Sequence, residues 1–503
     1  MTNEKNNFLT LKKLGIDTYK EAVLYMRKDC HVCASEGFEA HSRVKVTCHQ
    51  QSIIATLNMV SSNLLEKGKA GLSEYAWNLL DAREGDKITV SHAKHVTSLS
   101  YVRSKIYGHT LSNNELKEIV QDITAGKYSD IHLSSFLTAC AGHRMNNQEI
   151  ADLTNAMVDT GEKLSWEAKI VVDKHSVGGL PGNRTTPIIV SIVAAFGLTI
   201  PKTSSRAITS PAGTADTMEV LAPVKLDLAK IKNVVRQEHG CIVWGGAISL
   251  SPADDTMIGV ERALNIDSEA QLVASVLSKK IAAGSTHVII DMPVGPTAKI
   301  RTPQAAKQIK SHLESIGKKL GITVKVIFGD GTQPIGRGIG PALEARDVLS
   351  VLQNDSSAPK DLRDRAIKLS GNIFAFSPKI DEAEGIKIAT ELLDSGKAWR
   401  KFKNICEAQG GMRKIPKAPY IHDYLSTQAG MVISMDNRRI SLIAKLAGAP
   451  HDKAAGIDLH VSLGSKVKKN EILFTIHAQS PGELKYALDH LKEENYLIEI
   501  EEE

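Results

Sequence analysis

Two stretches rich in glycine and hydroxyl side chains contain residues suited to binding an anion. The first, Asp173–Thr186, follows a predicted strand over Ala168–Val172 and contains Lys174, Ser176 and three glycines. Backbone N–H groups can approach an oxyanion closely at glycine, and the helix predicted over Pro187–Phe196 adds the positive end of its dipole. The stretch can therefore bind phosphate. It is not a Walker loop, because the required Gly-Lys-Ser/Thr register is absent, and a structural turn explains it equally well in isolation.

The second stretch, Ser204–Thr217, follows the next predicted strand, Leu198–Lys202, and contains six hydroxyl side chains, one arginine and one glycine. Hydroxyl and guanidinium groups bind phosphate and sugar oxygens well. If the two strands are parallel neighbours, both stretches lie at the same edge of the sheet. A pair of Ser/Thr caps and turns is the alternative, which we consider weaker because both stretches converge.

The elements that must hold these residues indicate an α/β core with a mixed, largely parallel sheet, accompanied by a helical lobe, an N-terminal β-rich domain and a C-terminal α+β domain. Short alternating segments such as Arg43–Thr47 and Ser52–Leu57 predict strands, whereas Glu115–Ile123 has helical spacing. Further along, short apolar runs alternate with amphipathic helices, which is typical of βαβ units. The predicted domains are 1–88 (β-rich), 89–165 (helical lobe), 166–416 (α/β, phosphate- and nucleotide-binding) and 417–503 (hammerhead-like).

The composition narrows the class of protein. The chain has 503 residues, 42% hydrophobic and 24% charged, which is typical of a globular protein rather than a disordered or membrane-spanning one. The net charge is only +5, without long basic runs, so we expect no nucleic-acid polymer as a partner. Six scattered cysteines do not form a disulfide framework, and no secretory signal is visible, so we expect a cytoplasmic protein without membrane contact.

Cys30-His31-Val32-Cys33, with Cys48 and His49 nearby, offers a candidate zinc half-site. Two further ligands would have to come from a loop that folds back. We favour ordinary thiols and expect neither a metal nor a cofactor. The glycines after Gly336 do not fit a dinucleotide-binding register, because Pro341 stands where a glycine is needed.

Three motifs resemble the thymidine phosphorylase (pyrimidine-nucleoside phosphorylase) family. They are Asp-Lys-His-Ser-x-Gly-Gly from Asp173, Ser-x-Arg…Ala-Gly-Thr-x-Asp from Ser204, and Ala274–Lys280. The longer signature Ser-Ser-Arg-Ala-Ile-Thr-Ser is most similar to the AMP phosphorylase branch and its bacterial relatives, described as a type 2 thymidine phosphorylase subfamily. The resemblance covers nearly the whole chain.

The resemblance implies reversible phosphorolysis: inorganic phosphate, as a co-substrate, attacks the anomeric carbon of a nucleotide or nucleoside and releases the base. It also implies a homodimer formed through the helical lobe, or a higher homo-oligomer. The phosphate must be held beneath the sugar, and the departing base needs a proton.

The resemblance also assigns roles to individual residues. The catalytic residues are Asp267, as proton donor, and Lys174. The phosphate-binding residues are Lys174, Ser176, Thr186, Ser204 and Thr214. The substrate-binding residues are Gly179, Ser205, Arg206, Ala207, Ile208, Thr209, Ser210, Thr214, Ser275, Lys279 and Lys299.

Two of these assignments need comment. In isolation, Asp267-Ser268 before a helix is more often a cap than an acid, and only the resemblance reverses that preference. Arg262 stands at a different spacing from Ser275 than in thymidine-type members, which weakens pyrimidine recognition. We therefore favour a nucleoside 5′-monophosphate as substrate, with thymidine or another pyrimidine nucleoside as the alternative.

Two more distant functions remain open. A phosphoribosyltransferase would need magnesium-binding carboxylates near the glycine-rich loop, for which Asp254, Asp255 and Asp216 are weak candidates. A non-catalytic carrier function is suggested by 456–478, which is similar to biotinyl or lipoyl hammerheads, but no Met-Lys-Met occurs there. We interpret this module as structural.

Overall fold

The computed structural model describes residues 8–177, 179–207, 210–264, 268–493 and 497–502, with the backbone alone at Arg262. It divides into two compact units: Met1–Cys140 with Gly259–Leu264, and Ala141–Ile258 with Asn265–Glu503. Ile208, Thr209 and Asp267, three predicted site residues, lie outside the described residues.

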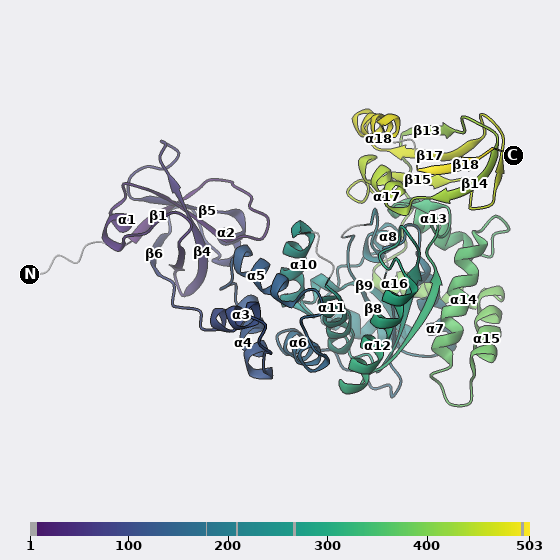
Figure 1. Ribbon diagram of the computed structural model, residues 1–503, viewed down its shortest axis with the longest axis horizontal. Helices are drawn as coiled ribbons and strands as arrows, with labels where there is room; N and C mark the ends of the chain where they lie inside the picture. Colours follow the sequence, from purple (N-terminus) through teal and green to yellow (C-terminus); the bar gives the residue numbers. More distant parts are fainter. Residues whose placement is uncertain (1–7, 178, 208–209, 265–267, 494–496, 503) are drawn as a thin grey trace, which may run out of the picture. The chain divides into compact units, whose positions relative to one another are not determined.

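The first unit begins with a closed six-stranded barrel (Figure 1), in the strand order β1-β5-β2-β4-β3-β6. Apolar and polar residues alternate along its strands: in β3, Val44, Val46 and Cys48 are buried, because every second side chain faces the barrel interior. The predicted β-rich domain is thus confirmed. The strands are β1 (Phe8–Lys13), β2 (Val23–Arg27), β3 (Arg43–Cys48), β4 (Gln51–Val60), β5 (Lys69–Leu72) and β6 (Lys87–His92).

Helices complete this unit. Amphipathic α4 buries Leu116, Ile119 and Val120 on one face and begins with a reciprocal capping box between Ser112 and Glu115. The helices are α1 (His31–Glu36), α2 (Glu74–Leu79), α3 (Ser98–Ile106), α4 (Asn113–Thr124) and α5 (Asp130–Cys140).

The second unit is built around five parallel strands. β10 lies between β11 and β7, while β8 pairs with β9, and a parallel bridge between Val171 and Thr199 joins the two sets. The largely parallel α/β core is thus confirmed, and its side chains pack against apolar α7 and α14. The strands are β7 (Val172–Ser176), β8 (Ile200–Ser204), β9 (Gly240–Trp244), β10 (His287–Val294) and β11 (Thr323–Asp330).

Helices lie before, between and after the strands of this sheet. They are α6 (Asn147–Asp159), α7 (Thr185–Phe196), α8 (Thr214–Leu221), α9 (Leu228–Glu238), the 3₁₀ turn η1 (Gly245–Ala247), α10 (Pro252–Leu264), α11 (Glu269–Ala282), α12 (Pro303–Lys319), α13 (Pro341–Leu352), α14 (Lys360–Phe374), α15 (Glu382–Asp394) and α16 (Lys397–Gln409).

One predicted strand is misplaced. We expected Ala168–Val172, with Asp173 and Lys174 already in the following loop, but β7 is Val172–Ser176 and buries both charged residues. A buried charge is tolerated when it is paired. The partners, Lys202, Lys280 and Asp291, come from other elements.

The C-terminal part is an α+β domain, as predicted. β17 lies between β15 and β13, and β14 lies between β16 and β18, all antiparallel, while β12 (Gly338–Ile339) extends the first sheet. The remaining elements are β13 (Tyr420–Leu425), β14 (Gly430–Met435), α17 (Asn437–Leu446), β15 (Gly456–Leu459), β16 (Lys466–Val467), β17 (Ile472–Ala478), α18 (Pro481–Glu493) and β18 (Ile498–Glu501). Within the described ranges, no helix combines the length and apolar character needed to cross a bilayer.

Candidate active site

Lys174 lies at the centre of a group of hydroxyls at the carboxyl end of β7. Its side chain is 1% exposed, its Nζ contacts Ser176 Oγ, and it donates a 2.8 Å hydrogen bond to Thr185 Oγ1. Ser176 ends β7 and Thr185 begins α7, so two elements bring these hydroxyls to one ammonium. Such a group can bind several oxygens of one phosphate.

Asp291 on β10 holds this group together. Its Oδ2 accepts from Ser176 Oγ at 2.9 Å and Asn183 Nδ2 at 3.0 Å and lies 3.5 Å from Lys174 Nζ. Its Oδ1 accepts from Arg365 Nη2 at 2.7 Å. Burial alone would raise the pKa of Asp291, but Lys174 and Arg365 keep it below the ordinary value. Asp291 is therefore a carboxylate that orients the Ser176 hydroxyl and the Lys174 ammonium.

The electrostatics of Lys174 favour an anion. Burial lowers the pKa of Lys174 to about 8, opposed by Asp291 and reinforced by Arg365 and Arg184. A phosphate bound at this ammonium would supply the missing negative charge and raise the pKa again.

Ser204 supplies a hydroxyl from the neighbouring strand. Ser176 and Ser204 each lie five residues beyond the bridged pair, Val171 and Thr199, so the parallel register brings them to the same level of the sheet. Ser204 Oγ is buried and has no hydrogen-bond partner among the described residues. Because a buried hydroxyl is normally paired, this atom fits a position that a ligand oxygen occupies.

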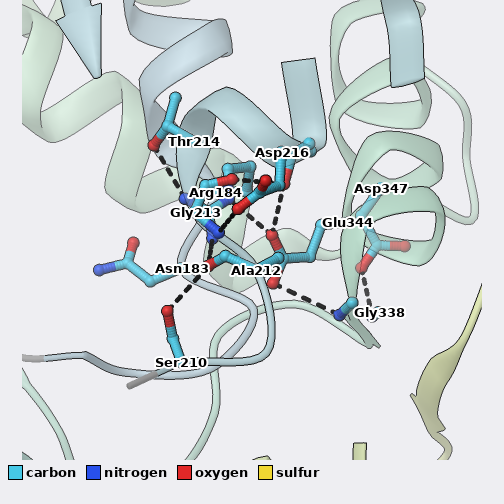
Figure 2. Close-up of polar contacts among 12 residues, drawn as sticks. Asn183, Arg184, Ser210, Ala212, Gly213, Thr214, Asp216, Gly338, Glu344 and Asp347 are labelled. Carbon is cyan, nitrogen blue, oxygen red and sulfur yellow. Dashed lines mark hydrogen bonds and ion pairs between the residues drawn. The ribbon is translucent and has the colours of Figure 1, made fainter. Parts of the chain in front are cut away.

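Arg184 joins the two predicted loops (Figure 2). Its Nη1 donates to Thr214 Oγ1 and its Nη2 to Ala212 O, each at 2.8 Å, while Nε donates to Glu344 Oε2 at 2.6 Å. Glu344 also accepts from Thr217 Oγ1 at 2.8 Å. Lys174 and Thr214 are thereby linked through consecutive residues, Thr185 and Arg184, so the two loops do converge.

The loop after Ser204 is held by its own charged residues. Arg206 does not extend freely: it donates to Asp216 at 3.0 Å and twice to Glu219, at 2.8 and 2.7 Å. Ser205 is exposed, and Ser210 Oγ donates to Ala212 O at 2.9 Å. Gly213 is required, since a Cβ there would lie 2.6 Å from Ala207 N.

A buried ion cluster lies behind the anion site. Asp173 is 3.1 Å from Lys202 Nζ and 2.8 Å from Lys280 Nζ. Burial lowers the pKa of Lys202 to about 7, with Asp173 opposing the shift and Lys280 adding to it. Burial also lowers the pKa of His175 well below its ordinary value, and the surrounding lysines add to this, so His175 is neutral at neutral pH. Burial alone would raise the pKa of Asp173, but Lys202 and Lys280 keep it below its ordinary value.

The other predicted site residues lie on separate elements. Ser275 and Lys279 are one turn apart on α11, and Lys279 contacts Asp254. Lys299 is exposed in the loop after β10, and Gly179 is exposed with a left-handed φ of 57°. Thr186 is buried in the first turn of α7. Their predicted roles in binding remain predictions.

Six residues around Lys174 and Arg184 were not predicted as site residues from the sequence: Asn183, Arg184, Thr185, Asp291, Glu344 and Arg365. Asn183-Arg184-Thr185 lies inside the first predicted loop, so its composition could have indicated the first three. Asp291, Glu344 and Arg365 are distant along the chain and carry no local signal.

Of the candidate zinc ligands, Cys30 and Cys33 make local contacts, whereas Cys48 and His49 lie together. Burial raises the pKa of Cys33 to about 12, and Cys30 caps α1 by accepting from Cys33 N at 3.2 Å. Within the described part of the chain, one group of three candidate ligands occurs, formed by Cys48, His49 and Asp86. Asp86 already accepts from His49 at 3.0 Å and from Arg83 N at 2.7 Å.

Comparison with known proteins agrees with this geometry. A model of the glycosyl transferase family helical bundle domain matches residues 99–161, the α/β domain of that family matches 168–399, and the pyrimidine nucleoside phosphorylase C-terminal domain matches 431–498. A Legionella pneumophila (strain Paris) protein named "Putative thymidine phosphorylase" is 58% identical over 99% of this chain and 96% of its own length. The chain belongs to the thymidine phosphorylase family. It is accordingly an enzyme of the pentosyltransferase class.

A second relative supports this family assignment, and one solved structure is similar in fold. A Hahella chejuensis protein of the same name is 55% identical over the full length of both chains. The anthranilate phosphoribosyltransferase of Saccharomyces cerevisiae, solved in complex with PRPP and Mg, is similar in fold, with a TM-score of 0.50 and 16% identity over 63% of this chain and 98% of that chain. That likeness concerns the fold alone.

Proposed function

We propose that this enzyme catalyses reversible phosphorolysis of the N-glycosidic bond of a nucleoside 5′-monophosphate, giving the free base and an α-pentose 1,5-bisphosphate. An oxygen of inorganic phosphate forms a bond to C1′ while the C1′–N bond breaks. The electron pair leaves on the base nitrogen, which takes a proton. The observation that carries the proposal is the buried Lys174 ammonium among the hydroxyls of Ser176 and Thr185.

In this proposal, each group has a defined task. The phosphate is held by Lys174, Ser176 and Thr185 and by the Ser204 hydroxyl, which has no partner among the described residues. Asp291 orients Ser176 and Lys174. Fixed cations that face the attacking anion reduce the reorganisation needed in the transition state. Asp267, predicted as the proton donor, lies outside the described residues.

The choice of a nucleotide depends on the second loop. The exposed Ser205 of this loop and the exposed Lys299 after β10 offer donors for a 5′-phosphate, and the Ser210 hydroxyl would have to leave Ala212 O to join them. A pyrimidine nucleoside such as thymidine is the second candidate, favoured by the names of the relatives and by the match to the C-terminal domain. We further propose a cytoplasmic homodimer or higher homo-oligomer that uses no metal or organic cofactor.

Base release from AMP, CMP, UMP and thymidine, each with and without inorganic phosphate, tests this proposal. We expect phosphate-dependent release from at least one nucleotide, with a higher kcat/KM than for thymidine. Strong release from thymidine and none from nucleotides would favour the second candidate. Release that is equally fast without phosphate would contradict both.

A further inference from the structure

The C-terminal domain contacts two loops that the proposed function assigns to the organic substrate. They are the loop before α8, with Ser205 and Ser210, and the loop after β10, with Lys299. We propose that the C-terminal domain sets the shape of the substrate site, with Lys453 and Asn437 as positioning residues that do not touch the substrate. This inference rests on the proposed function, because that function defines what the two loops bind. The C-terminal domain lies beside α8 and α13 in Figure 1.

Lys453 provides the first connection. It stands between α17 and β15, and its Nζ lies 3.5 Å from Asp216 Oδ1 and 3.1 Å from Glu219 Oε2. The backbone carbonyl of Lys453 accepts from Ala342 N at 2.9 Å, which fixes the lysine against α13. One side chain of the C-terminal domain therefore reaches two carboxylates on α8.

Asp216 connects Lys453 to the backbone of the loop before α8. Its Oδ2 accepts from Ala207 N at 2.7 Å and from Gly213 N at 3.0 Å, so one carboxylate holds both ends of the segment 207–213. Its Oδ1 faces Arg206 at 3.0 Å as well as Lys453. A shift of the Asp216 carboxylate would therefore displace the backbone at Ala207 and at Gly213.

Charge balance explains why Lys453 is needed. Arg206, whose guanidinium lies over Trp244 with 4.9 Å to the ring centroid, faces both Asp216 and Glu219. Without Lys453, two adjacent carboxylates would share one guanidinium. Two carboxylates that share one counter-ion repel each other, and the repulsion would displace the Asp216 carboxylate from the loop amides that it holds.

Asn437 provides the second, independent connection. It is the first residue of α17 and is buried, and its Nδ2 donates to Thr297 Oγ1 at 2.9 Å and to Gly331 O at 3.0 Å. Its backbone N also donates to Thr297 Oγ1, at 3.2 Å. Thr297 lies two residues before Lys299, so the C-terminal domain also fixes the loop that carries this predicted ligand.

Steady-state kinetics of the full-length enzyme, with the best substrate of the panel, test the role of Lys453. We expect Lys453→Met to raise KM for the organic substrate about tenfold, with KM for phosphate changed by less than about twofold and kcat little changed. Lys453→Arg should restore most of the affinity, since it keeps the charge. Lys485→Met, on α18, is the matched control. A KM in Lys453→Met equal to that of the control would overturn the assignment of Lys453.

Thr297→Val tests the second connection from the loop side, because it removes the oxygen that accepts from both Asn437 N and Asn437 Nδ2. We expect KM for the organic substrate to rise several-fold, measured well below the unfolding temperature, and the melting temperature to fall, because two donors of a buried residue lose their acceptor. An unchanged KM would overturn the assignment of Asn437.

Hydrogen exchange separates this inference from the proposed function. In Lys453→Met, we expect the amides of Ala207 and Gly213 to exchange about tenfold faster, because both donate to Asp216. This result does not depend on turnover. Inactivity of the wild type on the whole panel would contradict the proposed function, whereas unchanged exchange at these amides would overturn the positioning role.

Discussion

At the scale of single residues, the arrangement around Lys174 is costly for a protein to maintain without a ligand. The ammonium is buried, its pKa is lowered, and the Ser204 hydroxyl at the end of the neighbouring strand has no partner among the described residues. Desolvation of a charge and an unpaired hydroxyl both reduce the free energy of unfolding. A bound phosphate that reaches both groups would offset both costs.

Lys174→Met should therefore reduce phosphate-dependent turnover much more than it reduces the free energy of unfolding. We expect kcat/KM to fall by about 10³-fold, the scale on which fixed charge stabilises a transition state. Phosphate at about 100 times its Kd should stabilise the wild type by about 2.7 kcal/mol, visible as a rise in melting temperature, but leave the variant unchanged. A phosphate-induced shift that persists in the variant would place the anion elsewhere.

The lowered pKa of Lys174 also predicts a pH dependence. Phosphate binds the charged ammonium, and in the free enzyme this ammonium loses its proton as the pH rises through about 8. The affinity for phosphate should thus be fully present below this pH and fall by up to about tenfold per pH unit above it. Calorimetric titration with phosphate across this pH range measures the affinity. A Kd that stays constant to about pH 9.5 would disprove the dependence of phosphate binding on the Lys174 ammonium.

At the scale of elements, the loop before α8 depends on a glycine for close packing. A Cβ at Gly213 would meet Arg206 C and Ala207 N at 2.6 Å, so Gly213→Ala must displace the backbone that Asp216 holds. We expect KM for the organic substrate to rise at least about tenfold.

Gly259→Ala on α10 is the matched control for that change. A Cβ there meets nothing within 4 Å, so its kinetics should equal those of the wild type. If both alanine variants behaved alike, the loop would not require close packing at Gly213.

Elements with clear local boundaries were predicted well. The predicted strand Arg43–Thr47 and the predicted helix Pro187–Phe196 lie within two residues of β3 (Arg43–Cys48) and α7 (Thr185–Phe196). Alternating apolar side chains mark the strand, and Gly197 ends the helix. β7 was misplaced by about four residues, since Asp173, Lys174 and His175 have the composition of a loop. Their burial depends on charges that Lys202, Lys280 and Asp291 bring from other elements.

At the scale of the whole molecule, the site depends on residues that only the fold brings together. The two loops could be predicted because each follows a recognisable strand. Glu344 on α13 and Arg365 on α14 could not, because they reach Arg184 and Asp291 across more than 70 residues of chain. The same holds for Lys453, which acts on the site from another domain.

The charge distribution of the whole site also predicts independence from divalent metal. The carboxylates that could hold magnesium are engaged: Asp216 faces Arg206 and Lys453, and Asp254 contacts Lys279. We expect phosphorolysis to proceed unchanged with EDTA in place of magnesium. Loss of activity on chelation, restored by magnesium, would support a phosphoribosyltransferase-like reaction instead.

The fate of phosphate tests the central claim most directly. In a ³¹P NMR time course with enzyme, inorganic phosphate and the best substrate, the account predicts that the phosphate signal declines as a sugar 1-phosphate signal appears, in equal amounts with the free base. Lys174→Met should show neither change. Release of base with the phosphate signal constant would mean that water attacks the anomeric carbon, and the account would be wrong.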